Sequence, residues 1–413
     1  MTRTLFVVSA SLPHGLPDEG SDGPKKDYAA IARRLGADLL DWSAARRTLL
    51  LRLLCSVLGL AVVQAWLAFQ RRHDYDVLLT DGEHIGIPLA LMLKVARSRT
   101  VHVTIGHRLS TPKKRFFFRT LRVQTHLNAV VLHSRYQHDF ALDQLNFSPK
   151  QLALLPYQVD PDFWRPMPAV EEQMIASAGL EYRDYPTLFE AVDGLDVKLV
   201  VAAASHWSKR KNTALGTTRP ANVKVASYNY FELRDLFARA AIIVVPVDDV
   251  DFQAGVTTIL EAMAMGKPVI VTHTYGQTDV IEDRRSVTRG TEERARPVSL
   301  LRDVAEEEDI PIDPNGFYVP PKDPGALQRA ITFLLEHPED RVRLGQAGRR
   351  AVERLMTVDQ FAERIARVID LVTPPPGGRP SLTAVPTPSH GTPMAPATTA
   401  TPAQTVELER AAR

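Results

Sequence analysis

The segment that decides the fold runs from Val244 to Thr272 and reads VVPVDDVDFQAGVTTILEAMAMGKPVIVT. Both of its ends are β-branched runs without a polar side, which is typical of buried parallel strands. Between them, the polar loop 248–255 leads into a helix that Gly266 ends and that Pro268 prevents from resuming. The segment therefore predicts a βαβ unit whose loop lies at the carboxyl end of a strand, where open α/β sheets bind their ligands.

The start of the predicted helix and one residue inside it have the chemistry of a binding site. Glu261 has apolar neighbours in the sequence, and a carboxylate in such surroundings needs hydrogen-bond donors. The two vicinal hydroxyls of a ribose would supply them, and a solvated helix glutamate is the alternative. Backbone amides at a helix start make a seat for a phosphate or a sugar oxygen. Here they belong to Ala254, Gly255, Val256 and Thr257.

Residues 253–270 resemble the donor-site motif of the retaining GT-B glycosyltransferases of family 4. That motif is a glutamate, seven residues, a second glutamate, an alanine, and then Gly-x-Pro-Val. In this resemblance Glu261 is the glutamate that holds the nucleotide ribose, and Gln253 replaces the glutamate that contacts the donor sugar. A glutamine can still hydrogen-bond a sugar hydroxyl, but it carries no charge to stabilise an oxocarbenium-like centre.

The resemblance also assigns roles outside the central segment. His107 follows the predicted strand 101–105 and matches the histidine that faces the donor sugar; a loop histidine without a role is the alternative. Arg183 matches the cation that neutralises the donor diphosphate, whereas Leu180 stands where a companion arginine is usual.

Two further residues complete the implied donor site. Lys209, in a basic run, could compensate for the missing arginine, although a solvated loop is the alternative. Tyr228 or Tyr230 would stack on or rim the nucleobase, and plain packing is the alternative for either. The implied catalytic residues are His107, Arg183 and Gln253. The implied donor-binding residues are Arg183, Lys209, Tyr228, Gln253, Ala254, Gly255, Val256, Thr257 and Glu261.

The length of 413 residues suits two domains and a tail. Predicted strands alternate with helices through residues 1–165, which indicates a Rossmann-like first domain on the acceptor side. Residues 166–355 form the second, donor-binding Rossmann-like domain in the resemblance, and a helix within 356–372 crosses back to the first. Residues 373–413 are rich in Pro, Thr and Ala and predict a disordered tail. The expected α/β architecture is GT-B, with the two domains facing each other across a cleft.

Composition restricts the class and the compartment. Hydrophobic residues make up 45% of the chain and charged residues 24%, as in soluble globular proteins. Cys55 is the only cysteine, so an internal disulfide is excluded and a reducing compartment fits. The apolar run 5–9 is too short for a secretory signal, and we expect a cytoplasmic protein.

Positive charge is concentrated in the first domain. Residues 42–138 contain fifteen Lys and Arg against four Asp and Glu. This predicts an anionic partner. The partner would be either a phosphorylated acceptor or an anionic membrane surface, to which the protein would bind peripherally on the inner face of the cell membrane. No nucleic-acid module accompanies the charge, so nucleic acid is not expected. Segment 112–122 interleaves cations with three phenylalanines, which fits either an interfacial helix or one packed on the sheet.

Residues 48–69 are the most hydrophobic stretch, and Arg52 and Gln64 interrupt it. A core helix connecting two parallel strands is the favoured interpretation. A helix partly exposed to a membrane surface and a true membrane span are the alternatives, and the two polar residues argue against the span.

The resemblance implies an enzyme that transfers a hexosyl or other glycosyl group from a nucleotide sugar to an acceptor hydroxyl with retention of configuration. The acceptor would be a glycan or a lipid-linked sugar in polysaccharide, glycolipid or cell-envelope glycan synthesis. The nucleotide sugar is a substrate, so no cofactor is expected, and no Cys/His spacing suggests a metal. The alternative is a catalytically silent GT-B protein that binds or scaffolds at the membrane; a sugar-nucleotide epimerase fits the motif less well.

Overall fold

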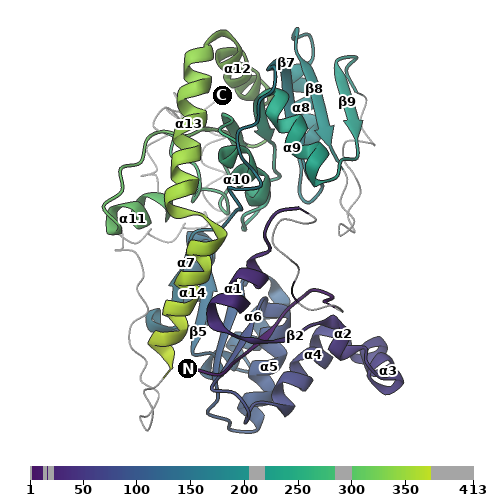
Figure 1. Cartoon of the computed structure of the whole chain (residues 1–413), viewed down its shortest axis with the longest axis vertical. Helices are drawn as coiled ribbons and strands as arrows, with labels where there is room; N and C mark the ends of the chain where they lie inside the picture. Colours follow the sequence, from purple (N-terminus) through teal and green to yellow (C-terminus); the bar gives the residue numbers. More distant parts are fainter. Residues whose placement is uncertain (1, 13–15, 17–22, 204–218, 284–299, 374–413) are drawn as a thin grey trace, which may run out of the picture.

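The computed structural model describes residues 2–12, 16, 23–203, 219–283 and 300–373. It contains two six-stranded parallel sheets, one in each domain, stacked along the long axis of the molecule (Figure 1). The predicted pair of Rossmann-like domains is therefore confirmed. The predicted disordered tail lies outside the described residues except for Thr373.

The first domain has the strand order β2-β1-β3-β4-β5-β6. All neighbours are parallel, and the central strands are buried because helices cover both faces of the sheet. The strands are β1 Thr4–Val7, β2 Asp38–Leu40, β3 Val77–Thr80, β4 Val101–Gly106, β5 Ala129–Leu132 and β6 Leu152–Leu154. The helices are α1 Asp27–Leu35, α2 Trp42–Ala45, α3 Leu49–Leu58, α4 Leu60–Gln70, α5 Glu83–Val95, α6 Pro112–Arg119 and α7 Arg135–Leu145, with 3-10 turns η1 Val123–His126 and η2 Pro149–Gln151.

The second domain repeats this plan with the order β12-β11-β10-β7-β8-β9. Its strands are β7 Glu172–Ala178, β8 Lys198–Ala202, β9 Val223–Ala226, β10 Ala240–Val245, β11 Val269–Thr272 and β12 Phe317–Val319. Its helices are α8 Tyr185–Val192, α9 Tyr230–Arg239, α10 Val256–Ala264, α11 Leu300–Glu307, α12 Pro324–Glu336 and α13 Pro338–Leu355.

The last helix, α14 (Val358–Val372), returns to the first domain as predicted (Figure 1). It packs against α1, and Phe361, Ile365 and Ile369 are buried in the core of the first sheet. The chain thus crosses between the domains twice, and the two crossings are bonded to each other. Val159 donates to the carbonyl of Met356 (2.9 Å), and Val358 donates to the carbonyl of Val159 (3.1 Å).

The hydrophobic stretch 48–69 forms two helices instead of one. Gly59, with φ of 89°, separates α3 from α4. Helix α4 packs on α5 and buries four residues, so the interpretation as a core helix is right for this half. It is wrong for α3, because none of the ten described residues of that helix is buried. Among the described residues, no helix has the length and apolar character to cross a membrane.

Gln64 explains why a polar residue interrupts the apolar run. Its side chain is 1% exposed, and its amide donates to the carbonyl of Val8 (3.0 Å) and, more weakly, to that of Leu40 (3.5 Å). These carbonyls lie at the carboxyl ends of β1 and β2, so Gln64 fixes α4 on the sheet edge beside the interdomain cleft.

We expect Gln64→Leu to lower the free energy of unfolding by about 1–3 kcal/mol, because it leaves the carbonyl of Val8 without its donor, whereas the carbonyl of Leu40 keeps the N–H of Val8 (3.0 Å). Urea denaturation of the purified chain measures this. Gln70→Leu, at the exposed end of the same helix, is the matched control and should change little. Equal midpoints for the two variants would show that Gln64 does not hold the sheet edge.

Candidate functional site

The predicted βαβ unit is present as β10, α10 and β11. Gly255 precedes α10 with φ of 82°, and a Cβ added there would lie 2.8 Å from Val245 and 3.2 Å from Arg183. Only glycine fits this turn. The N–H of Ala254 donates to the carbonyl of Phe252 (2.7 Å), so Ala254 leaves the predicted seat of free amides. Gly255, Val256 and Thr257 remain, and their N–H groups have no backbone acceptor among the described residues.

Arg183 lies beneath this helix start. It follows β7, is 4% exposed, and donates to the carbonyls of Ala178 (2.9 Å) and Glu181 (2.8 Å). Its guanidinium also contacts the Thr258 hydroxyl of α10 (3.4 Å). Burial lowers the pKa of Arg183, and the charge of Glu261 opposes this. The structure therefore places a cation at the helix end that already favours anions.

Glu261 lies in α10 with its side chain only partly exposed. Burial raises the pKa of this carboxyl to about 8, against the opposing charges of Arg183 and Lys26. Lys26 belongs to the first domain, and its ammonium lies 4.6 Å from the ring centre of Tyr230 in the second. Within the described part of the chain, nothing donates a hydrogen bond to the Glu261 carboxylate. The arrangement fits a carboxylate whose donors arrive with a ligand.

Gln253 belongs to a group of buried polar atoms without partners. Both amide atoms of Gln253 and of Gln277, together with the Thr274 hydroxyl, are buried and make no hydrogen bond to any described residue. The loops that carry them are in contact, since Gly276 donates to Val250 (3.0 Å). A buried polar group without a partner is costly, so this pair of loops is suited to a ligand rich in hydroxyls.

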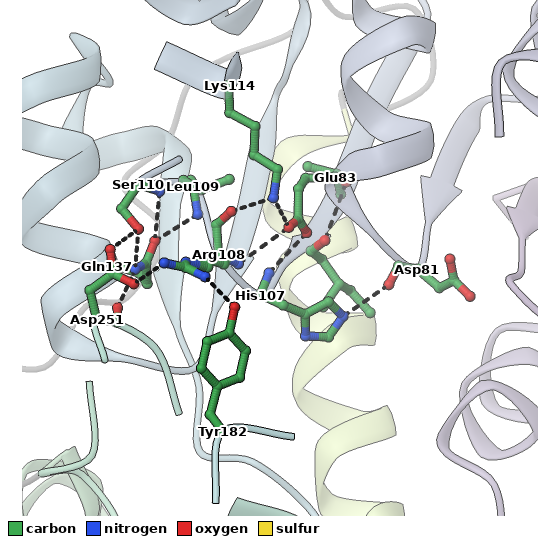
Figure 2. Close-up of polar contacts among 12 residues, drawn as sticks. Asp81, Glu83, His107, Arg108, Leu109, Ser110, Lys114, Gln137, Tyr182 and Asp251 are labelled. Carbon is green, nitrogen blue, oxygen red and sulfur yellow. Dashed lines mark hydrogen bonds and ion pairs between the residues drawn. The ribbon is translucent and has the colours of Figure 1, made fainter. Parts of the chain in front are cut away.

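The first domain contributes His107, which lies beside Asp81 and Glu83 (Figure 2). Its backbone N–H donates to the Glu83 carboxylate (3.0 Å), and its ring Nε2 lies 3.2 Å from the carbonyl of Asp81. Lys114 donates to the same carboxylate (2.6 Å). Burial opposes ionisation of Glu83, but His107 and Lys114 lower its pKa to about 2. Glu83 was missed by the sequence analysis, although an acidic residue that opens a helix after a buried strand was a usable signal.

Side chains of the two domains meet beside His107 (Figure 2). Arg108 forms an ion pair with Asp251 (2.8 Å) and donates to the hydroxyl of Tyr182 (3.1 Å). The Ser110 hydroxyl also donates to Asp251 (2.6 Å). Asp251 stands two residues before Gln253, so these contacts hold the Gln253 loop against the first domain. The sequence analysis identified none of these contacts.

A cavity of about 290 Å³ opens next to His107 in the first domain. The ring of His133 stacks on His107 with centres 5.8 Å apart, and burial lowers the pKa of His133 to about 3, so its imidazole is neutral. The polar residues that line it are Ser9, Asp27, Tyr28, Asp81, His84, His107, His133, Tyr157 and Gln158.

The structure adds little about two of the predicted donor-binding residues, Tyr228 and Lys209. Tyr228 follows β9 and is partly buried against the core of the second domain. Lys209 lies outside the described residues. No group of His, Cys, Asp and Glu suited to a metal ion occurs in the ranges that the structure describes.

Residues 182–337 match the family model of the glycosyl transferases group 1. The match covers 156 of the 413 residues. It contains the central motif, Arg183 and Gln277, and it confirms the predicted resemblance at the level of the glycosyl transferases group 1. A comparison with curated protein sequences finds no match.

Solved structures share the fold of the whole chain. The glycosyltransferase from Rickettsia africae ESF-5 is 14% identical with a TM-score of 0.61, over 90% of this chain and 98% of that one. Sucrose-phosphate synthase from Thermosynechococcus elongatus is 16% identical with a TM-score of 0.61, over 90% and 98%. Anabaena Alr3699/HepE, solved in complex with UDP, is 15% identical with a TM-score of 0.62, over 89% and 100%. The chain has the GT-B fold.

The raised pKa of Glu261 predicts how stability depends on pH. The folded protein keeps this carboxyl protonated up to about pH 8, whereas an unfolded chain ionises it near its ordinary 4.5. Stability therefore falls as pH rises through this window. We expect Glu261→Gln to raise the unfolding free energy at pH 8.5 by on the order of 2 kcal/mol, and to have little effect at pH 4.

Urea titrations at the two pH values measure this difference. Glu190→Gln, on the exposed face of α8, is the control and should have the same small effect on the unfolding free energy at both pH values. The same gain for Glu261→Gln at pH 4 as at pH 8.5 would contradict the assignment.

Proposed function

We propose that this protein transfers a sugar from a nucleotide-sugar donor to an acceptor hydroxyl with retention of anomeric configuration. The observation that carries the proposal is the cluster of buried, unpartnered side-chain atoms of Gln253 and Gln277 beside the start of α10. Such atoms require hydrogen-bonding partners, and the hydroxyls of a sugar match them. Glu261 on the same helix then receives the nucleotide ribose.

The donor would lie along the carboxyl edge of the second sheet. Its diphosphate fits the first turn of α10, where free amides and the Arg183 guanidinium meet. Its base would lie toward Tyr228. Anabaena Alr3699/HepE was solved with UDP and with UDP-glucose, which favours uridine nucleotides as the first donors to test.

In the proposed reaction, the bond between the anomeric carbon and the departing phosphate breaks while the acceptor oxygen bonds to the same face. The acceptor proton passes to the departing phosphate oxygen. Arg183 and the helix amides stabilise the negative charge that develops on the leaving group. His107 faces the sugar from the first domain. Gln253 positions a sugar hydroxyl without contributing charge.

The acceptor would enter from the first domain. The cavity beside His107 has several polar side chains, among them Ser9, Asp81 and His84, which suit a hydroxyl-rich acceptor. The Ser9 hydroxyl lies 2.8 Å from His84 Nε2 and 2.9 Å from Asp81. A glycan or the sugar of a lipid-linked intermediate in polysaccharide, glycolipid or cell-envelope glycan synthesis fits this chemistry.

One observation favours a second candidate function. Gln253 is uncharged where the motif usually has a glutamate, which suits a protein that binds the donor without transferring the sugar. The test is a thermal-shift panel of UDP-, GDP- and ADP-sugars, followed by release of nucleoside diphosphate with and without acceptor glycans. NMR of the product then reports the anomer. Binding without turnover supports the silent protein, an inverted product refutes retention, and absence of binding overturns both candidates.

Glu261→Gln should weaken donor binding by about 1.5–3 kcal/mol, because the charge-assisted bond to the ribose is lost. Calorimetric titration at pH 8.5 with the donor found in the panel measures this affinity. Glu190→Gln again serves as the control. A folded Glu261→Gln variant with an unchanged titration would remove Glu261 from the site.

Arg183 gives a prediction about metal dependence. If Arg183 and the backbone amides of α10 neutralise the diphosphate charge, no metal ion is needed and activity survives EDTA. Arg183→Ala should weaken UDP binding at least tenfold, roughly 1.4 kcal/mol, and leave uridine binding nearly unchanged, which separates phosphate contacts from misfolding. Arg329→Ala on the exposed face of α12 is the control. An absolute requirement for Mn²⁺ or Mg²⁺ would refute the proposed role.

A further inference from the structure

Helix α3 presents an apolar face that the rest of the described chain leaves uncovered. Leu49, Leu53 and Val57 are spaced four residues apart, so they lie on one side of the helix. Their exposed fractions are 81%, 61% and 74%. Leu50 and Leu58 extend this surface with 66% and 55% exposure. We call these five residues the α3 face. The helix projects from the edge of the first domain, away from the second (Figure 1).

The α3 face is part of an ordered helix, because contacts at the start and in the middle of α3 hold it in place. The Thr48 hydroxyl accepts from the N–H of Leu51 (3.2 Å) and caps the first turn. Arg52 donates to the carbonyl of Arg46 (2.9 Å), and the Cys55 thiol contacts the carbonyl of Ala45 (3.4 Å). These contacts keep one side of α3 against α2, which leaves the apolar side facing outward.

The charged residues of segment 42–73, which carries the α3 face, are all positive. Arg46, Arg47 and Arg52 are exposed next to it. Between residues 42 and 73 the sequence contains no Asp or Glu. An apolar helix surface with a cationic border is the composition of helices that lie in the interfacial plane of a membrane.

We propose that the α3 face docks the protein on an anionic lipid bilayer. The leucines and Val57 enter the boundary between headgroups and acyl chains, and the three arginines bind lipid phosphates at the surface. The helix lies in the plane of the membrane, because its ten residues are too few to span it.

A second copy of the chain is a poorer occupant of this face. A symmetric contact would place the same patch of both copies together. Arg46, Arg47 and Arg52 would then meet their own like charges, and the segment offers no carboxylate to compensate. An anionic bilayer supplies both the apolar phase and the negative charge.

The other predicted membrane segment, 112–122, is less exposed than α3. In α6, Phe118 is buried in the core and Lys114 pairs with Glu83. Phe116 is 53% exposed, whereas Phe117 is partly buried and Phe118 is buried. Segment 112–122 therefore contributes mainly charge, and we assign the apolar contact to α3.

The test is flotation of the full chain with two kinds of vesicle, phosphatidylglycerol mixed with phosphatidylcholine and phosphatidylcholine alone, at low and physiological salt. We expect binding to the anionic vesicles that weakens with salt, because screening reduces the arginine contribution. Leu53→Ser/Val57→Ser should lower the partition coefficient at least about tenfold, since two exposed apolar side chains no longer enter the lipid. Val95→Ser/Val342→Ser, at exposed valines elsewhere, is the matched control and should bind like the wild type.

Equal recovery of the wild type with both lipids, or equal binding of the two double variants, would overturn the proposal. Analytical ultracentrifugation without lipid examines the second copy. A wild-type dimer that Leu53→Ser/Val57→Ser converts to monomer, together with no lipid binding, would assign the α3 face to self-association and also overturn it. Flotation is measured without donor or acceptor, so its result does not depend on the proposed transferase activity.

Discussion

The candidate donor site depends on the packing of the buried Arg183 guanidinium between β7 and α10. It fills the space between Gly179 and Gly255, where an added Cβ would lie 2.4 Å and 3.2 Å from it. The two glycines and the arginine therefore require one another. Together they fix the end of β7 against the start of α10, and the loop that carries Gln253 leaves from this junction. A cation buried with carbonyl partners is costly to desolvate, which is reasonable where an anionic ligand balances it.

The two domains build the site from complementary halves. The second domain supplies the Arg183 cation, the backbone amides at the start of α10 and the unpartnered side-chain amides of Gln253 and Gln277. The first domain supplies His107 and a polar cavity. Glu83 orders the first half, because one ionised carboxylate holds the backbone of His107 and the ammonium of Lys114. Asp251 joins the halves through Arg108. Site geometry therefore depends on contacts across the cleft as much as on either sheet.

The sequence predicted what is encoded locally. The βαβ unit around α10 and the alternation of the first sheet follow from apolar periodicity and from Gly and Pro signals. The second sheet as a domain and the return of α14 were implied by the family resemblance. The sequence could not predict Asp251, because its partners are distant in the chain and any surface carboxylate has the same local pattern. Glu83 had a local signal at the start of a helix, but its partners His107 and Lys114 are also distant in the chain. Gly59 was a sequence signal for the break between α3 and α4. Hydrophobicity alone suggested that α3 is buried, but the exposure of a helix depends on which elements pack against it.

The paired crossings at Val159 and Thr357 affect how the cleft opens. Two separate tethers would allow the domains to twist and slide against each other. Here the two strands of chain are bonded side by side, with Val159 bonded on both sides to the segment 356–358. The two crossings therefore act as a single connection between the domains, and this short ladder is where a hinge would lie. Opening at this point would separate Arg108 from Asp251, and Arg135 from Asp279 and Asp303, because these pairs join the two domains.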